Sequence, residues 1–142
     1  MPLRAIAYVS EALPARMEGR LDLIVDDAAR FNRLAGVTGV LLHDGTRFLQ
    51  YIEGPPDGMD LVYERILQAR SHAGVIELAR GTVSRRQFPY WSMRWLSVDG
   101  ECIRQVSQGD WLGFSRRPVG GRSRPGAIDL LDQVVQPLLS VG

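Results

Sequence analysis

The sequence contains one cysteine, Cys102, and two histidines, His43 and His72, far apart along the chain. A single cysteine cannot form an internal disulfide, and these three residues lack the spacing of a metal site. There is also no apolar run long enough to span a membrane, and the N-terminus does not resemble a signal peptide. The sequence therefore predicts a cytoplasmic protein without a bound metal.

Net charge is nearly absent too, because 17 basic and 16 acidic residues leave a formal charge of +1. This balance gives no electrostatic reason to expect a nucleic-acid partner. The arginine clusters in "SRRQFP" and "FSRRPVGGRSRP" favour solvated loops over a partner or phosphate surface. No GxSxG, HExxH or P-loop motif occurs, and no glycine-rich turn has Rossmann spacing. These absences argue against the corresponding classes of enzyme.

What the chain does contain is enough apolar sequence for one globular domain, with 45% hydrophobic residues in 142. We expect strands at 3–10, 37–43, 48–53, 74–83 and 90–98, and helices at 20–35 and 55–70. The order βαββαβ plus one strand predicts an α+β, ferredoxin-like sandwich with both helices on one sheet face. On the second helix, the expected apolar stripe is Leu61, Val62, Ile66 and Ala69.

The remaining residues suggest a C-terminal helical extension over 99–142 following a core of residues 1–98, with too few residues for a separate effector domain. "GECIRQVSQGDW" predicts a short helix, and residues 115–126 predict a loop or linker. "GAIDLLDQVVQPLL" predicts an amphipathic helix that Pro137 ends or kinks near Gln136. We expect this helix to cover the sheet face opposite the first two helices.

Several polar side chains fall on the faces that should be buried. Gln50 lies among hydrophobic residues on one face of its strand, Tyr8 shares a strand face with Ile6, and Asn32 lies in an apolar stripe of the first helix. Arg65 borders the space between them from the second helix. Each one alone is ordinarily a core residue bonded to the protein. Together they predict a slot between the helices for a planar polar ligand. An amide offers both a donor and an acceptor, which suits the ring edge of a flavin or a purine.

The chain also resembles the BLUF domains, the sensors of blue light using FAD, over about residues 3–96. The central motif is Gly-(Val/Ile)-Thr-Gly followed by Phe-x-Gln-x-(Ile/Leu)-Glu-Gly-Pro. The matching segments are "AYVS" with Tyr8, "FNRLAGVTGVLLHDGTRFLQYIEGP" with Asn32 and Gln50, "YERI" with Arg65 and Ile66, and "FPYWSM" with Trp91 and Met93. Phe31, Ala69 and Trp95 depart from the residues found in some relatives.

The resemblance implies an FAD cofactor whose isoalloxazine ring lies between the two helices. By this likeness, Asn32 bonds the carbonyl edge of the ring, and Arg65 lies near the other polar edge or the ribityl chain. The apolar contacts implied are Ile24 and Ile66, which flank the ring, and Leu41 and Phe48, which close the pocket. Gln50 bonds the flavin and Tyr8, and His72 matches a position near the cofactor in some members.

The resemblance also implies a photoreceptor rather than an enzyme. Light drives an electron and a proton from Tyr8, and the Gln50 amide rearranges by rotation or tautomerisation, which shifts the flavin absorption to the red. The expected two-state element is the fifth strand, where Trp91, Met93 and Trp95 should share one face. The output would be an effector protein in trans or a change in homo-oligomerisation.

Two other interpretations remain open at this stage. A flavin enzyme would need a substrate opening and a general acid or base that the sequence does not identify. A ferredoxin-like binding module would keep the fold without flavin. The colour of the purified protein, and its response to blue light, separates the three.

Overall fold

The computed structural model describes residues 3–13, 21–69, 72–89, 91–109, 111 and 127–139. A five-stranded mixed sheet has the order β4-β1-β3-β2-β5, with β5 parallel to β2 and the other neighbours antiparallel. The elements are β1 (Leu3–Ala12), α2 (Leu21–Ala35), β2 (Thr38–His43), β3 (Arg47–Gly54), α3 (Pro56–Gln68), β4 (His72–Val83), β5 (Arg94–Ser97), α4 (Gly100–Ser107) and α5 (Ala127–Leu139). The expected α+β fold is confirmed.

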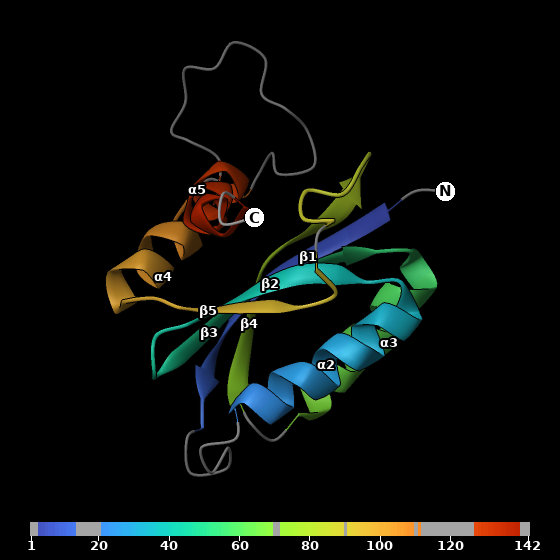
Figure 1. Cartoon of the computed structure of the whole chain (residues 1–142), viewed down its shortest axis with the longest axis horizontal. Helices are drawn as coiled ribbons and strands as arrows, with labels where there is room; N and C mark the ends of the chain where they lie inside the picture. The colour runs from blue at the N-terminus through green and yellow to red at the C-terminus, as the bar shows by residue number, and fades with distance from the viewer. Residues whose placement is uncertain are drawn as a thin grey trace.

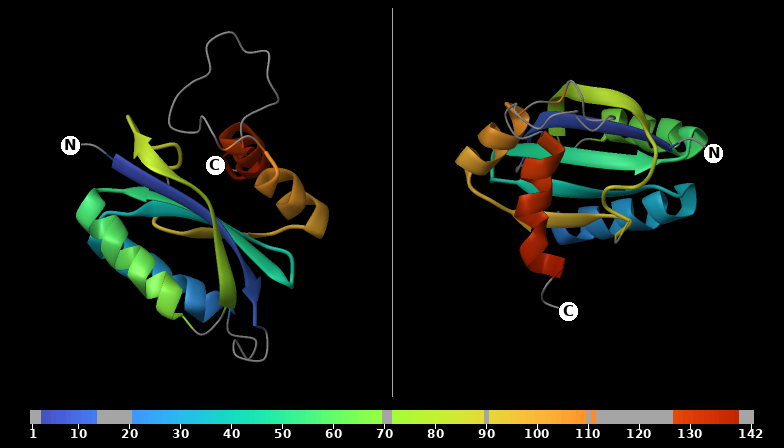
Figure 2. Two further views of the ribbon diagram at one scale, coloured as in Figure 1. Left: turned by 180° about the vertical axis from the view of Figure 1, so that it is seen from behind. Right: turned by 90° about the horizontal axis from the view of Figure 1, so that it is seen from above.

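The helices form a layer on each side of the sheet. α2 and α3 lie side by side against one face, and α4 and α5 lie against the other (Figure 1). Figure 2 shows the same two layers from behind and from above. On the face of α4 and α5, Ala7, Leu49 and Tyr51 of the sheet share a buried core with Ile103 and Leu131. The expectation that the C-terminal helix covers this face is confirmed, while the domain boundary at residue 98 stays a prediction.

The hairpin between β2 and β3 sets the register of the central strands. Asp44 Oδ1 accepts the backbone N–H groups of Thr46 and Arg47 at 2.9 and 2.7 Å. Gly45, between Asp44 and Thr46, has a φ of 100°, which glycine adopts at little cost. The resulting register pairs Gln50 with Leu41 on one side and with Tyr8 on the other.

Two features allow α2 and α3 to approach each other closely. α2 ends at Ala35, where the sequence predicted, and the next residue, Gly36, has a φ of 75°, as is common just after a helix. At the start of α3, a Cβ on Gly58 would lie 2.0 Å from the backbone oxygen of Ala35, so only glycine fits this crossing. On the side of the helix pair that faces the sheet, Val25 of α2 and Met59 and Val62 of α3 are buried against Ile6 and Ile52 of the sheet.

Three expectations about individual elements are wrong or fall outside the description. Leu61 is 56% exposed, and Met59 is buried in its place. α5 continues to Leu139, so Pro137 does not end the helix near Gln136; proline removes only its own N–H donor, and the φ of about −65° that its ring fixes is compatible with a helix. The predicted loop at 115–126 lies outside the described residues. Among the helices that are described, none has the length and apolarity needed to cross a membrane.

The expected shared face of Trp91, Met93 and Trp95 is also wrong. β5 begins at Arg94, so Trp91 and Met93 precede the strand, where the alternation of period two does not apply. Trp91 packs with the core on the side of α4 and α5, whereas Met93 is buried with the core of α2 and α3. Trp95 packs on the same side as Met93.

Candidate ligand-binding site between the two helices

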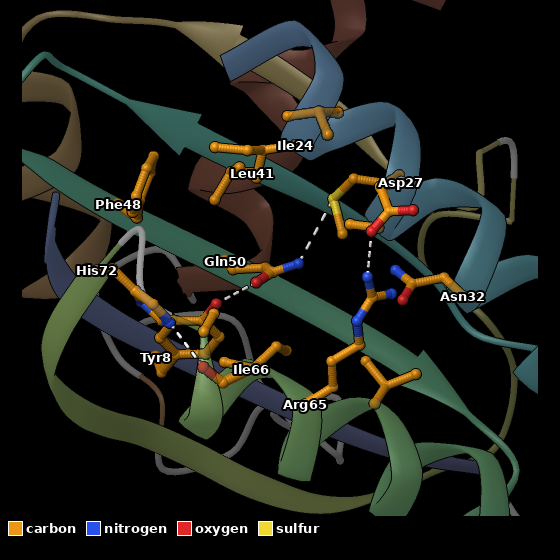
Figure 3. A pocket seen from close by; sticks show the side chains of 15 residues that line it. Tyr8, Ile24, Asp27, Asn32, Leu41, Phe48, Gln50, Arg65, Ile66 and His72 are labelled. Atoms are coloured by element: carbon orange, nitrogen blue, oxygen red, sulfur yellow. Dashed lines mark hydrogen bonds and ion pairs between the residues drawn. The ribbon is translucent and has the colours of Figure 1, made fainter. Parts of the chain in front are cut away.

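A cavity of about 360 Å³ lies between α2, α3 and the sheet (Figure 3). This volume is within the usual range of about 300–1,000 Å³ for small-molecule sites. The cavity is lined by all eight residues that the sequence associated with a cofactor, namely Ile24, Asn32, Leu41, Phe48, Gln50, Arg65, Ile66 and His72. Tyr8 and Met93 line it as well. The structure therefore gathers residues from both helices and from strands β1, β2, β3 and β4 around one space.

Gln50 projects from the centre of β3 into this cavity and is bonded at both ends of its amide (Figure 3). The Tyr8 hydroxyl donates to Gln50 Oε1, and Gln50 Nε2 donates to Met93 Sδ at 3.5 Å. Tyr8 and Gln50 are only 3% and 6% exposed, so neither can turn to solvent instead. Burial, with a smaller contribution from Tyr63, raises the pKa of Tyr8. The phenol is therefore held in its neutral, donating form.

Asn32 projects from α2 with half of its amide committed to the protein. Its Nδ2 donates to the backbone oxygen of Ser92 at 2.9 Å, and the side chain is 3% exposed. Among the described residues, none donates to its Oδ1. The sequence does not predict the Ser92 contact, because the two residues are 60 positions apart and Ser92 contributes only its backbone. The free amide oxygen is available to a ligand in the cavity.

Arg65 of α3 forms an ion pair with Asp27 of α2 across the cavity, as Figure 3 shows. Its guanidinium carbon also lies 4.5 Å from the centre of the Phe31 ring. Asp27 and Phe31 are four residues apart, so they lie on one face of α2. This spacing could have predicted that both contact the same neighbouring side chain. Ion pairs this exposed contribute about 0–1 kcal/mol, so a ligand can displace Asp27 at small cost.

His72 of β4 closes the end of the cavity beside Tyr8 and connects three elements. Its Nε2 is 2.7 Å from the backbone oxygen of Ile66, and its Nδ1 is 2.6 Å from Ser10 Oγ. A carbonyl oxygen can only accept, so Nε2 carries a proton, and in the neutral ring Nδ1 accepts from the Ser10 hydroxyl. Ser10 was not predicted, although it shares a β1 face with Tyr8 at a spacing of two.

Trp91 is the one predicted switch residue that does not line this cavity. It lines a second cleft of about 530 Å³, together with Arg33, Arg86 and Met93. Met93 therefore lies between the two spaces and contributes to the walls of both. A movement of its side chain would change the shape of each.

The walls of the first cavity suit a flat ring with polar edges. Ile24 and Ile66 contribute apolar surface from the two helices, and Leu41 and Phe48 contribute it from the sheet. Asn32 and Gln50 add amide groups among these hydrophobic side chains. An isoalloxazine ring has this combination of apolar faces and alternating C=O and N–H groups on its edge. Among the described residues, no cluster of His, Cys, Asp or Glu side chains could hold a metal.

Comparison with known proteins agrees with this chemistry. Residues 3–94 match the family model described as "BLUF: Sensors of blue-light using FAD". The photoactivated adenylate cyclase subunit beta of Euglena longa is 35% identical over an alignment of 89 residues, and the match covers 61% of this chain and 10% of the cyclase. The blue light- and temperature-regulated antirepressor BluF of Escherichia coli (strain K12) is 33% identical over 86 residues, which are 61% of this chain and 21% of the antirepressor.

Solved structures show the same likeness in three dimensions. The dark-state structure titled "BlrB - a BLUF protein" superposes with a TM-score of 0.64 at 30% identity, covering 68% of this chain and 73% of that one. The structure titled "BlrP1 BLUF" superposes with a TM-score of 0.62 at 32% identity, covering 68% of this chain and 66% of that one.

Proposed function

The chain belongs to the BLUF family of blue-light sensors that bind FAD, and from this premise we propose that Tyr8, Gln50 and Met93 form its light-driven switch. The observation that carries the proposal is the continuous set of contacts from the Tyr8 hydroxyl through the Gln50 amide to the Met93 sulfur. All three residues are buried, so a change at one end must be accommodated at the other.

We propose that the residues of the first cavity hold the flavin ring. Asn32 Oδ1 accepts from an N–H group on the edge of the ring, and Arg65 leaves Asp27 to donate to an acceptor of the cofactor. Ile24 and Ile66 pack on the faces of the ring. FAD, when bound, supplies a chromophore that absorbs blue light and draws an electron in its excited state.

The hydrogen bonds of Gln50 explain how its rearrangement would reach Met93. A half-turn of the amide would exchange Nε2 for Oε1 at the Met93 sulfur. Both atoms are then acceptors, so the contact changes from attraction to repulsion. At the other end, Nε2 would face the Tyr8 hydroxyl, which can accept as well as donate. The switch therefore favours one position of Met93 before light and another after it.

We propose that the second cleft passes this change to a partner. Met93 lines both spaces, so its displacement alters the cleft that also contains Trp91, Arg33 and Arg86. An effector protein in trans, or a second copy of this chain, would bind one form of the cleft better than the other, in the cytoplasm. The name of the relative in E. coli, an antirepressor, supports an output through a partner.

The experiment is a light-minus-dark absorption spectrum of the FAD-loaded protein and of two matched tyrosine variants. The unaltered protein should show a reversible red shift, and Tyr8→Phe should bind FAD without this shift. Tyr63→Phe removes a hydroxyl from a ring 6.3 Å away that does not bond Gln50, and it should keep the shift. A full shift in Tyr8→Phe contradicts the proposed switch. A yellow protein with turnover and no shift would indicate a flavin enzyme, and a colourless one that cannot be loaded would indicate a binding module.

A further inference from the structure

Glu53 lies on β3 three residues beyond Gln50 and on the opposite face of the sheet. Its carboxylate is fully buried, yet it receives three hydrogen bonds: from the Tyr51 hydroxyl at 2.9 Å, from the backbone N–H of Gln87 at 2.9 Å and from that of Phe88 at 2.6 Å. Burial raises the pKa of Glu53, and the two backbone N–H groups oppose that rise. A buried carboxyl is tolerated only with such partners.

The side chain of Arg86, the residue before Gln87, forms three further hydrogen bonds with β2, β3 and the residue that follows α2. Its Nη1 donates to Thr38 Oγ1 at 2.9 Å and to the backbone oxygen of Glu53 at 3.2 Å. Its Nη2 donates to the backbone oxygen of Gly36 at 2.6 Å. We call Glu53, Arg86 and the backbone N–H groups of Gln87 and Phe88 the Glu53 network.

The segment that begins in this network ends at the flavin cavity. The backbone oxygen of Trp91 accepts from the N–H of Gly39 at 3.1 Å. The backbone oxygen of Ser92 accepts from Asn32, and the sulfur of Met93 accepts from Gln50. Residues 86–88 are thus bonded to the sheet near Glu53. Residues 91–93 are bonded to Gly39 of the sheet, to the proposed flavin ligand Asn32 and to the proposed switch residue Gln50.

Stability alone does not account for a carboxylate at this position. A buried ionic group is often no more stabilising than a well-packed apolar side chain. What a carboxylate adds is a fixed geometry, because its two oxygens receive the consecutive N–H groups of Gln87 and Phe88 separately. An apolar residue could fill the space, but it could not determine the register of the chain that leads to Met93.

We propose that Glu53 is a positioning residue of the light switch, which holds this segment in the register where Ser92 meets Asn32 and Met93 meets Gln50. This inference rests on the proposed function, since it gives Glu53 a role through Met93. A weakened network would let Met93 move more easily between its two positions, and the red-shifted state would then decay faster. Glu53 therefore prolongs the lifetime of the red-shifted state.

The test compares Glu53→Gln with the matched control Tyr51→Phe in the FAD-loaded protein. Glu53→Gln keeps the size of the side chain but replaces one acceptor oxygen with an NH₂ group, so one backbone N–H of Gln87 or Phe88 loses its partner. Tyr51→Phe removes the third donor to Glu53 and leaves both loop contacts in place. Thermal unfolding of both variants measures how much stability each one loses.

We expect the red-shifted state of Glu53→Gln to decay roughly tenfold faster than that of the unaltered protein, a factor that corresponds to ~1.4 kcal/mol. In Tyr51→Phe, the decay should stay at the unaltered rate. Amide hydrogen exchange in the dark should accelerate at Gln87 and Phe88 in Glu53→Gln, and not in Tyr51→Phe. If Glu53→Gln does not fold, Arg86→Lys tests the same segment, because a lysine keeps the charge but cannot make the forked bonds.

Unchanged decay in a folded, FAD-binding Glu53→Gln overturns the inference, as does equal acceleration in Tyr51→Phe, which would indicate a general loss of stability. For Arg86→Lys, an unaltered decay rate has the same meaning. If the unaltered protein shows no red shift, the proposed function fails. The inference about Glu53 can still be tested on its own, because unchanged hydrogen exchange at Gln87 and Phe88 in Glu53→Gln would show that the network does not hold the segment.

Discussion

Replacing Gln50 with leucine removes both hydrogen-bonding ends of the amide while keeping a side chain of similar size. Leucine suits the hydrophobic neighbours Phe48 and Ile52 on the same strand face. The sulfur of Met93 is a weak acceptor and loses little when its donor disappears. Tyr8, however, is only 3% exposed, and its hydroxyl loses its acceptor. The cost of this exchange therefore lies mainly at Tyr8.

A buried hydroxyl without a partner costs about 1–3 kcal/mol, so Gln50→Leu should lower the free energy of unfolding by that amount. Tyr8→Phe should cost a similar amount, because it leaves Gln50 Oε1 without its donor. The double variant removes both partners and should be more stable than the sum of the two losses predicts. The coupling free energy between the positions should be about 1–3 kcal/mol.

Urea unfolding of the flavin-free protein measures these free energies without a contribution from FAD affinity. Light-minus-dark spectra of the FAD-loaded variants then test function, and Gln50→Leu should bind FAD but show no red-shifted state. A coupling free energy near zero would refute the energetic reasoning. A reversible, full red shift in Gln50→Leu would refute the role of the amide in the switch.

Three further outcomes follow from individual contacts. Asn32→Ala should raise the Kd for FAD about two- to tenfold, as expected for the loss of one hydrogen bond. Equilibrium dialysis measures this Kd, and an unchanged value would show that Asn32 does not bind the cofactor. Ser10→Ala should lower the free energy of unfolding by about 1–3 kcal/mol, because buried His72 loses its hydroxyl donor; urea unfolding with no loss would contradict it. Because the pKa of Tyr8 is raised, the neutral phenol should persist in the folded protein above the usual value of about 10. The red shift should therefore keep its amplitude from pH 7 to pH 10, whereas stability should fall as the pH rises further, since only the unfolded chain releases this proton; loss of amplitude with a midpoint near pH 9 would contradict the assignment.

Much of the site could be predicted from the sequence, because it lies on regular elements. The alternation of β1 and β3 places Tyr8 and Gln50 on the faces that the structure shows. The Asp44-Gly45 turn predicts the hairpin that pairs β2 with β3, and helical periodicity places Asn32 on the buried side of α2. In these elements each residue's direction follows from its position in a repeat, so local sequence is sufficient.

The segment between β4 and β5 could not be predicted in the same way, since it has no repeat. Trp91 and Met93 are two residues apart and line one cleft together, yet they pack against different hydrophobic cores. The partners of this segment, Glu53, Asn32 and Gln50, are more than 30 residues away in the sequence and meet it only after the sheet has formed. Local sequence by itself determined that Tyr8, Gln50 and Asn32 lie on the buried faces of their elements. Tertiary structure decided which of them Met93 contacts, because hydrogen bonds between distant elements fix an irregular chain that has no periodicity of its own.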